Sequence, residues 1–367
     1  ASTTTIEAGA VLDASATGNG DGGTIVAWSD IHNPAGSTTV AGTLRATGGS
    51  EGGNGGRIET SGHWLNTGGI AINASAAQGL AGLWLLDPTN VTISTSASTG
   101  GSLSGALGQA GVSNINTTDL QTAINAGTSV NVVASGSITQ QAALTFNVAT
   151  GGQMPTLTLD NTSGSKQDIT LAAISDSTTA TGAGVNVKAL SAGGAITAGG
   201  AISLKGGVTL DNTYQVGGTS SGFITLANAS TLATTSSNGV TVNGALTGAG
   251  DVVLRGVTYA SGGNRGVASA ADITSTGGNV TIKGMSAHPT GGEGIKCTTT
   301  CSITANSGVV DLDGQTAGAG AAIAWQTGTI STRKLSVKGT NTANSAYTGL
   351  LLVSATIVPG RSFAPGE

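Results

Sequence analysis

The sequence is poor in charged and aromatic residues. Of its 367 residues only 8% are charged and 3% are aromatic, with six prolines and two methionines. An ordinary globular domain has about a quarter of its residues charged. A helical bundle or doubly wound sheet of this size would lack the bulky side chains that such folds pack. Disorder is also disfavoured, because the hydrophobic fraction is 38%, the mean hydropathy is +0.17 and the net charge is only -5.

Scarce charge and short apolar runs also disfavour several partners. Thirteen basic and eighteen acidic residues, without a cluster of either, offer no electrostatic footprint for nucleic acid. No run reaches the roughly 20 apolar residues of a membrane-spanning helix. Ala1 is not followed by the basic and apolar stretches of a signal peptide, so we expect that a leader was removed or that the chain is part of a longer precursor.

Only two cysteines are present, Cys297 and Cys301, separated by three threonines. Without a third cysteine or a nearby histidine pair, zinc is disfavoured, and we expect neither a metal ion nor a cofactor. A local disulfide is favoured, and the alternative is two buried thiols. Closing so short a loop stabilises the fold by about 2 kcal/mol in the chain-entropy model. A disulfide would indicate an oxidising compartment.

Glycine is abundant, with 62 residues, and it separates short runs of alternating small or β-branched residues. Glycine, Asn, Ser and Asp bound almost every run, as they do at tight turns. The runs predict strands of about three to five residues. They cover residues 24–27, 91–93, 130–133, 157–159, 185–187 and 240–242.

The last third of the chain repeats itself. The segment 250–256 has counterparts at 278–284, 308–314 and 335–339, a step of about 26 to 30 residues. Stacked coils would bury modest aliphatic side chains in inward ladders and leave Thr, Ser and Asn outside. The pattern predicts an all-β fold, a right-handed parallel β-helix, with another β-solenoid or a sandwich as the alternative. About 13 to 16 coils would form a rod about 60 to 75 Å long.

One segment has a helical pattern. Residues 117–127 begin with hydroxyl and Asp capping residues, place Leu120, Ala123 and Ile124 on one face, and end at Gly127. A short surface helix is therefore predicted near 118–126, after a loop at 100–113. The predicted organisation is β-helix coils at 1–87, a seam at 88–128, and β-helix repeats of about 20 to 30 residues at 129–367.

Three glycine-led segments carry a family resemblance. Residues 23–30, 56–65 and 82–93, with the helix and strand within 120–138, resemble large exoproteins of the filamentous haemagglutinin type. The resemblance covers about residues 20–140 and implies a right-handed β-helix, secretion through an outer-membrane partner, and adhesion or aggregation at the bacterial surface. The family's secretion domain is not recognisable, since Asn33-Pro34 stands alone. We therefore expect an interior or processed portion of such an exoprotein.

Candidate catalytic and metal-binding groups are few. Asp311 and Asp313 would face outward together on one strand, with Lys283 in register one coil earlier, and a solvated ion pair is favoured there over catalysis. The stretch 18–23 loosely resembles a calcium-binding turn through Asp21, but a plain turn is favoured. Residues 48–56 also predict a turn, because the ending of a phosphate-binding loop is missing.

The remaining candidates are aromatic, histidine and asparagine side chains. A tryptophan could stack on sugars if exposed, but Trp64 and Trp84 are expected to be packed. The sets are Trp28, Trp64, Trp84 and Trp325; His32, His63 and His288; and sequons starting at Asn73, Asn90, Asn116, Asn161, Asn228 and Asn279.

These observations favour a secreted, non-catalytic bacterial surface exoprotein that acts as an adhesin or stalk in adhesion, aggregation or biofilm. The expected partners are an outer-membrane secretion protein and a host or bacterial surface glycan or protein, with end-to-end self-association possible and no nucleic acid. Two alternatives stay open. One is a structural subunit of an extracellular filament or sheath, and the other is a carbohydrate-active β-helix enzyme, a polysaccharide lyase or hydrolase.

Overall fold

Short parallel strands, stacked coil upon coil, make up almost all the regular structure, which confirms the predicted all-β parallel β-helix. The computed structural model describes residues 2–96, 112–164, 166–215, 219–220, 238–325, 327–342, 349–352 and 355–359. The chain divides into two units, the first comprising residues 1–164 and 174–187 and the second residues 165–173 and 188–367. The loop predicted at 100–113 lies outside the described residues, apart from its last two.

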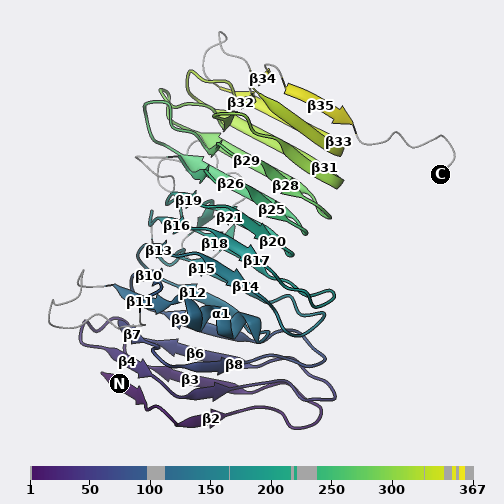
Figure 1. Ribbon diagram of the computed structural model, residues 1–367. Coiled ribbons are helices and arrows are strands. Elements are labelled where there is room, and N and C mark those ends of the chain that lie inside the picture. Colours follow the sequence, from purple (N-terminus) through teal and green to yellow (C-terminus); the bar gives the residue numbers. More distant parts are fainter. Residues whose placement is uncertain are drawn as a thin grey trace. The chain divides into compact units, whose positions relative to one another are not determined.

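The first unit begins with three coils of three strands each (Figure 1). Equivalent strands of successive coils pair in parallel as β1-β4-β7, β2-β5-β8 and β3-β6-β9, and the last set continues into β12 and β15. The strands are β1 Thr3–Ile6, β2 Val11–Asp13, β3 Thr24–Trp28, β4 Ser37–Val40, β5 Thr43–Arg45, β6 Arg57–Ser61, β7 Trp64–Asn66, β8 Ala71–Asn73, β9 Leu83–Asp87, β10 Val91–Ser94, β11 Ser113–Asn116, β12 Ser129–Val133, β13 Ile138–Gln140, β14 Leu144–Phe146, β15 Thr156–Asp160 and β17 Ile174–Asp176.

The predicted helix is present as α1 (Thr117–Asn125), with Leu120, Ala123 and Ile124 buried as expected. Its N-cap differs from the prediction, because the Oδ1 atom of Asn116, not a hydroxyl or Asp side chain, accepts the hydrogen bond from Thr118 N at 2.7 Å. Gly127 follows with φ +90°, the left-handed conformation that favours glycine after a helix.

Helix α1 takes the place of a strand in the wall of the coil. It contacts β8 on one side and β14 on the other (Figure 1). The Gln121 and Asn125 side chains accept hydrogen bonds from Thr145 N at 2.6 Å and Asn147 N at 2.7 Å. These are backbone donors of the strand-forming segment above, which a strand below would otherwise satisfy. The helix is therefore part of the wall, not an element laid on its surface.

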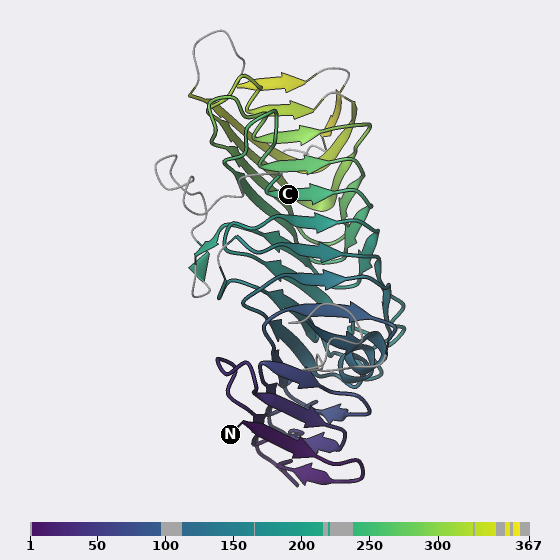
Figure 2. The same ribbon diagram turned by 90° about the vertical axis from the view of Figure 1, so that its left-hand side faces the viewer.

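The second unit has the same architecture, and Figure 2 shows its strands stacked in columns. Inward ladders run from coil to coil, for example Ile196–Val240–Val267–Ile295–Ile323, all fully or almost fully buried. Its strands are β16 Ile169–Leu171, β19 Ile196–Ala198, β20 Ile202–Leu204, β21 Val208–Asp211, β22 Tyr214–Gln215, β23 Thr219–Ser220, β24 Val240–Val242, β25 Leu246–Gly248, β26 Val252–Thr258, β27 Val267–Ser269, β28 Ile273–Ser275, β29 Val280–Ser286, β30 Ile295–Cys297, β31 Ile303–Thr316, β32 Ile323–Trp325, β33 Gly328–Asn341, β34 Leu350–Leu352 and β35 Ala355–Pro359; β18 (Asn186–Leu190) joins the two units in sequence.

The repeat predicted in the last third is confirmed by the strand register. Val252, Val280, Val310 and Leu335 are cross-strand partners on β26, β29, β31 and β33. The predicted length of about three to five residues is wrong for β26 and β29, which each contain seven residues, and for β31 and β33, which each contain 14. Strand β31 pairs with both β28 and β29, so two faces of the coil merge into one strand, with an irregularity between Ala305 and Val309.

Candidate functional site

Three of the four tryptophans are structural. Trp84 and Trp325 are fully buried, and their Nε1 atoms donate to Thr60 Oγ1 and Cys301 O, both at 2.9 Å. Trp64 is 8% exposed and donates to Pro34 O at 2.7 Å. The prediction that Trp64 and Trp84 are packed is thus confirmed. Trp28 is the exception, because 57% of it is exposed.

The alternation of strand β3 turns Trp28 outward. Ile25 and Ala27 are buried, while Val26 and Trp28 between and after them are exposed. Strand β3 stacks closely on β6 of the next coil. This close approach requires glycine at position 56, because a Cβ atom there would lie only 2.1 Å from Gly23 O. The outward direction of Trp28 therefore follows from the register of the stacked coils.

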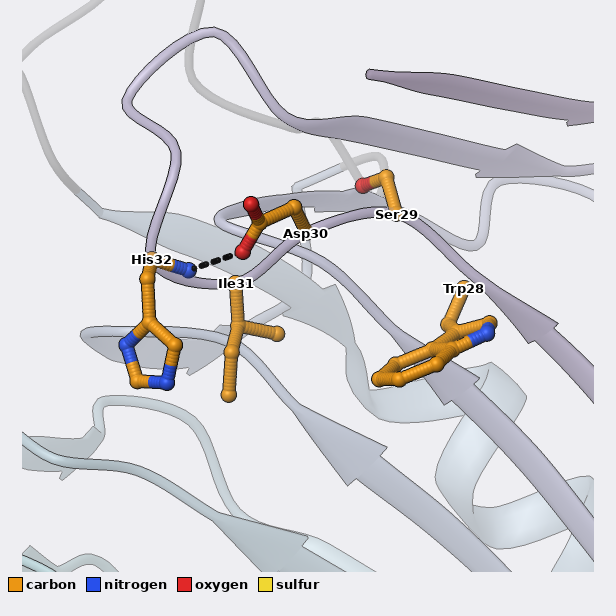
Figure 3. Close-up of a pocket in the computed structure, with 5 residues that line it drawn as sticks. All are labelled: Trp28, Ser29, Asp30, Ile31 and His32. Carbon is orange, nitrogen blue, oxygen red and sulfur yellow. Dashed lines mark hydrogen bonds between the residues drawn. The ribbon is translucent and has the colours of Figure 1, made fainter. Parts of the chain in front are cut away.

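Trp28 borders a hollow of about 480 Å³ that is lined by the segment 28–32. Figure 3 shows the Trp28, Ile31 and His32 side chains pointing to the same side of this segment. The turn is held locally by Asp30, whose Oδ1 accepts from His32 N at 2.9 Å. It is held to the next coil through His63, whose Nδ1 lies 3.1 Å from Ile31 O. The hollow thus has an aromatic side and an imidazole on a fixed turn.

Two carboxylates lie on the outer face of the next two coils. Trp28, Ser61 and Asp87 are consecutive cross-strand partners on β3, β6 and β9, and Glu59 is two residues before Ser61. Burial raises the pKa of Asp87 to about 6, repulsion from Glu59 and Asp160 adds to the rise, and His32 opposes it. We refer to Trp28, Ile31, His32, Glu59 and Asp87 as the Trp28 site.

The two carboxylates differ in their partners. Glu59 forms an ion pair with Arg57 at 3.0 Å and accepts a hydrogen bond from Ser61 Oγ at 3.3 Å. Asp87 forms no ion pair with any residue that the structure describes. A half-buried carboxylate without a counter-charge is unfavourable when ionised, and it becomes favourable when a ligand brings a donor or a positive charge.

Sequence reasoning missed Glu59 and Asp87, because it treated the acidic residues of this region as scattered. A signal was present in the three glycine-led segments. When Gly23, Gly56 and Gly82 are aligned, Trp28, Ser61 and Asp87 fall on one position, and the structure has the same register.

The predicted acidic pair lies as expected, and among the described residues no third acidic or histidine side chain joins it in a metal-binding arrangement. Leu312 is buried between Asp311 and Asp313, which both face outward, and Lys283 is the cross-strand partner of Asp313. Lys338 Nζ lies 4.0 Å from Asp313 Oδ2 on the other side. Asp313 thus lies between two lysines, the arrangement of an outer-face charge ladder.

The glycine-rich turns join coils through their side chains and backbone. Asp21 Oδ1 accepts from Asn54 N at 2.6 Å, and Asn54 Oδ1 accepts from Leu80 N at 2.9 Å, so each coil binds the next. In the stretch 48–56, Gly49 N donates to Gly20 O at 2.9 Å. Within the described ranges no three His, Cys, Asp or Glu side chains are placed to hold a metal ion together.

The other predicted polar residues have local structural contacts. His63 packs edge-on against Trp64 with ring centroids 5.0 Å apart, and His288 packs against Tyr259 at 5.2 Å. Among the sequon asparagines, Asn161 is fully buried, Asn116 caps α1, and Asn279 Oδ1 accepts from Val309 N at 2.9 Å. Asn73 Oδ1 accepts from Ser75 N and Oγ, and Asn90 Oδ1 accepts from Ser137 N. Asn228 lies outside the described residues.

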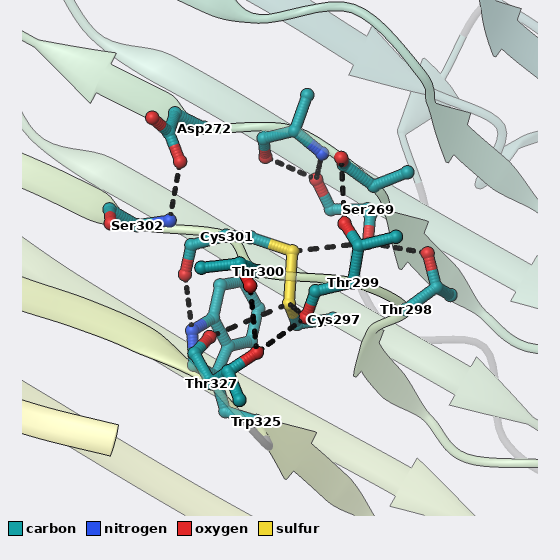
Figure 4. The surroundings of a disulfide bond; sticks show 12 residues. Ser269, Asp272, Cys297, Thr298, Thr299, Thr300, Cys301, Ser302, Trp325 and Thr327 are labelled. Carbon is teal, nitrogen blue, oxygen red and sulfur yellow. Dashed lines mark hydrogen bonds between the residues drawn. A yellow bond between two sulfur atoms is a disulfide. The ribbon is translucent and has the colours of Figure 1, made fainter. Parts of the chain in front are cut away.

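The predicted disulfide between Cys297 and Cys301 is present (Figure 4). Both cysteines are fully buried. Neighbouring coils cover the bridge: Thr299 Oγ1 donates to Ala270 O on the coil before, and Thr327 Oγ1 donates to Thr299 O from the coil after. The bond therefore closes a turn inside the stack, with both sulfur atoms shielded from solvent.

A second ionic cluster lies on the second unit. Glu293 Oε2 accepts from Arg265 Nε at 3.0 Å, and Glu293 Oε1 accepts from Lys296 Nζ at 2.7 Å. Burial alone would raise the pKa of Glu293, but the hydrogen bond from Lys296 and the charge of Arg265 outweigh burial and lower it. This carboxylate is fully neutralised, in contrast to Asp87.

Comparison with known proteins adds no relative from which a function could be transferred. In the described part of the chain no helix has the length and apolarity needed to cross a bilayer. No protein-family model matches the chain, and neither does any curated protein sequence.

Proposed function

We propose that the chain is a non-catalytic part of a secreted bacterial surface protein, an adhesin or stalk that acts by contact, and that the Trp28 site is its contact surface for a glycan. The observation that carries the proposal is the 57% exposure of Trp28 in a protein whose other tryptophans are buried. The resemblance of residues 20–140 to haemagglutinin-type exoproteins and the disulfide, which favours an oxidising compartment, support it.

The chemistry of the site suits a sugar. An indole ring offers a flat apolar platform and loses little conformational entropy on binding, since it has only two side-chain torsions. Sugars have one face of C–H groups, which can stack on the ring, and a rim of hydroxyls. The carboxylates of Glu59 and Asp87 can accept hydrogen bonds from such hydroxyls, and His32 can donate one. The hollow beside Trp28 leaves space for the ring.

The test is binding of the purified chain to a panel of immobilised oligosaccharides. We expect Trp28→Ala to reduce binding by about 1 to 3 kcal/mol of affinity, the range of aromatic stacking contacts, and Trp28→Phe to retain part of it. Leu80→Ala is the matched control, because Leu80 is a 76% exposed apolar residue of the same unit outside the site. Equal binding by Trp28→Ala and the unmodified chain would overturn the proposal.

A second candidate, a glycoside-cleaving enzyme, is favoured by one observation. Glu59 and Asp87 lie on neighbouring coils and repel each other, and the raised pKa of Asp87 would suit a proton donor beside a second carboxyl group. The pairing of Glu59 with Arg57 argues against a nucleophile or base, because the guanidinium stabilises its ground state. Release of reducing ends from a polysaccharide panel, lost in both Asp87→Asn and Glu59→Gln, would establish the enzyme instead.

A further inference from the structure

We infer that the glycan bound at the Trp28 site is a cationic amino sugar, a glucosamine-type saccharide whose amine is free and positively charged. This inference rests on the function proposed above and adds the class of ligand. It comes from the position of Asp87 relative to Trp28 and from the distribution of charge in the first unit.

Trp28 and Asp87 are spaced for one short saccharide. They occupy the same position two coils apart, with Ser61 between them. At about 4.8 Å per coil, their Cα atoms are about 10 Å apart along the stack. Two linked sugar rings cover such a span, so one ring can stack on the indole while the next directs a substituent toward the carboxylate.

The carboxylate at the far end of this span has no counter-charge of its own. The sequence of the first unit contains ten acidic residues and only two basic ones, Arg45 and Arg57. Arg57 is paired with Glu59, and Arg45 is the cross-strand partner of Asp13. Neither is therefore free to neutralise Asp87.

The titratable groups around Asp87 are two carboxylates and two imidazoles. Glu59 on β6 and Asp160 on β15 add negative charge, and the Asp160 carboxylate already accepts from Thr162 N at 2.9 Å. His32 in the turn after β3 attracts Asp87. His63 in the next turn lies 3.5 Å from Thr89 Oγ1 through its Nδ1 atom. A cation on the ligand would supply the counter-charge that Asp87 lacks.

An ammonium group gains more here than any neutral or anionic substituent. It would donate charge-assisted hydrogen bonds to Asp87, which are about twice as strong as neutral ones. The ammonium of the ring that stacks on Trp28, being close to the indole, would gain a cation–π attraction. An N-acetylated sugar lacks the charge, and a uronic acid would be repelled by Glu59, Asp87 and Asp160.

The binding should strengthen as pH rises through about 6, because Asp87 must lose its proton to pair with the cation. The ligand's own amine also titrates, so an oligosaccharide of N,N,N-trimethyl glucosamine, which keeps its charge at every pH, isolates the titration of the protein.

The experiment compares oligomers of glucosamine, N,N,N-trimethyl glucosamine, N-acetylglucosamine and galacturonic acid by calorimetry. At pH 7 we expect the glucosamine oligomer to bind at least about tenfold more tightly than the acetylated one. The trimethylated oligomer, which has the charge but no N–H to donate, should keep only the part of this preference that comes from charge and cation–π attraction. Asp87→Asn should remove this preference, and Trp28→Ala should weaken both ligands. Glu51→Gln is the control for net charge, since Glu51 is an exposed acid in a turn of the same unit.

The outcomes separate the inference from the function on which it rests. If the acetylated and cationic oligomers bind equally and both depend on Trp28, the glycan-binding function stands and the charge preference is overturned. If a preference survives in Asp87→Asn, the site is not the source of it and the inference fails. If no oligosaccharide binds in a Trp28-dependent manner, the proposed function itself fails. Circular dichroism of each variant confirms that the β-helix is intact.

Discussion

Arg255 donates a hydrogen bond of 3.1 Å from its guanidinium to the carboxylate of Asp211, its cross-strand partner on the neighbouring coil, and Asp211 is fully buried. The ladder continues in register from Arg255 to Lys283, Asp313 and Lys338. In a protein with so few charges, this column gathers five of them at one strand position of the second unit, from the buried Asp211 to the exposed Lys338.

Removing Arg255 should destabilise the second unit. Arg255→Met removes the ion pair of the buried Asp211 carboxylate and leaves its hydrogen bonds from Thr213 N and Oγ1 in place. We expect a loss of about 1 to 3 kcal/mol in the free energy of unfolding. Urea unfolding followed by circular dichroism measures it. The matched control is Lys338→Met, because the Lys338 side chain is 68% exposed and 4.0 Å from Asp313, which predicts less than about 0.5 kcal/mol. An equal effect of the two variants would contradict the expectation.

Replacing Cys297 and Cys301 together by alanine should lower stability by about 2 kcal/mol, the entropy of closing a loop this short. Because both residues are fully buried, dithiothreitol without denaturant should leave the bond intact. Alkylation followed by mass spectrometry reads the thiols before and after unfolding. Labelling of both cysteines in the native, unreduced protein would show that the bond is absent.

The side-chain acceptors of α1 protect the strand above the helix. Gln121→Ala and Asn125→Ala remove the acceptors of Thr145 N and Asn147 N, and each should cost about 1 kcal/mol. Hydrogen exchange of these two amides should accelerate. Thr122→Ala, an exposed position of the same helix, is the control. If exchange of the two amides is unchanged in a variant that combines Gln121→Ala and Asn125→Ala, the side chains of α1 do not protect the edge of this strand.

Asp87 should make stability fall as pH rises. Its folded-state pKa of about 6 lies above the unfolded value near 3.8, so the folded state binds more protons between these values. The destabilising contribution is absent below about pH 3.8 and fully present above about pH 6. Asp87→Asn should therefore match the unmodified chain at pH 3 and exceed it by about 1 to 2 kcal/mol at pH 7, less than a fully buried group would give. Thermal unfolding at both pH values measures the difference, and equal stability at pH 7 would refute it.

Strand positions and coil register could be predicted from two features of the sequence. Alternating apolar and polar residues mark the strands, and glycines mark the turns between them. Val252, Val280 and Val310 are equivalent in the sequence repeat and are partners in the sheets. The length of β31 could not be predicted in this way. Asn306-Ser307-Gly308 are typical turn residues and therefore predict that the strand ends there, but the chain bends at these residues and stays in the sheet.

The candidate site was less accessible from the sequence for a physical reason. A tryptophan on a strand is exposed or buried according to which face of the strand it lies on. For Trp28 the outward face could be derived from its alternation with the apolar Ile25 and Ala27. The closeness of Asp87 to His32 depends on how the turn after β3 folds toward the following coils. No periodicity specifies that turn, whose conformation follows from single contacts such as that of His63 with Ile31.

The substitution of α1 for a strand has a consequence for protein engineering. The wall of this β-helix accepts a nine-residue helix between β8 and β14, and the strands β9 and β12 on either side of the insertion still pair in register. One strand of a coil can therefore be replaced by a helix when the side chains of the helix accept the backbone hydrogen bonds that the strand would have accepted. Foreign helical epitopes or binding peptides that keep amide side chains at the positions of Gln121 and Asn125 could be grafted there while stacking continues on both sides.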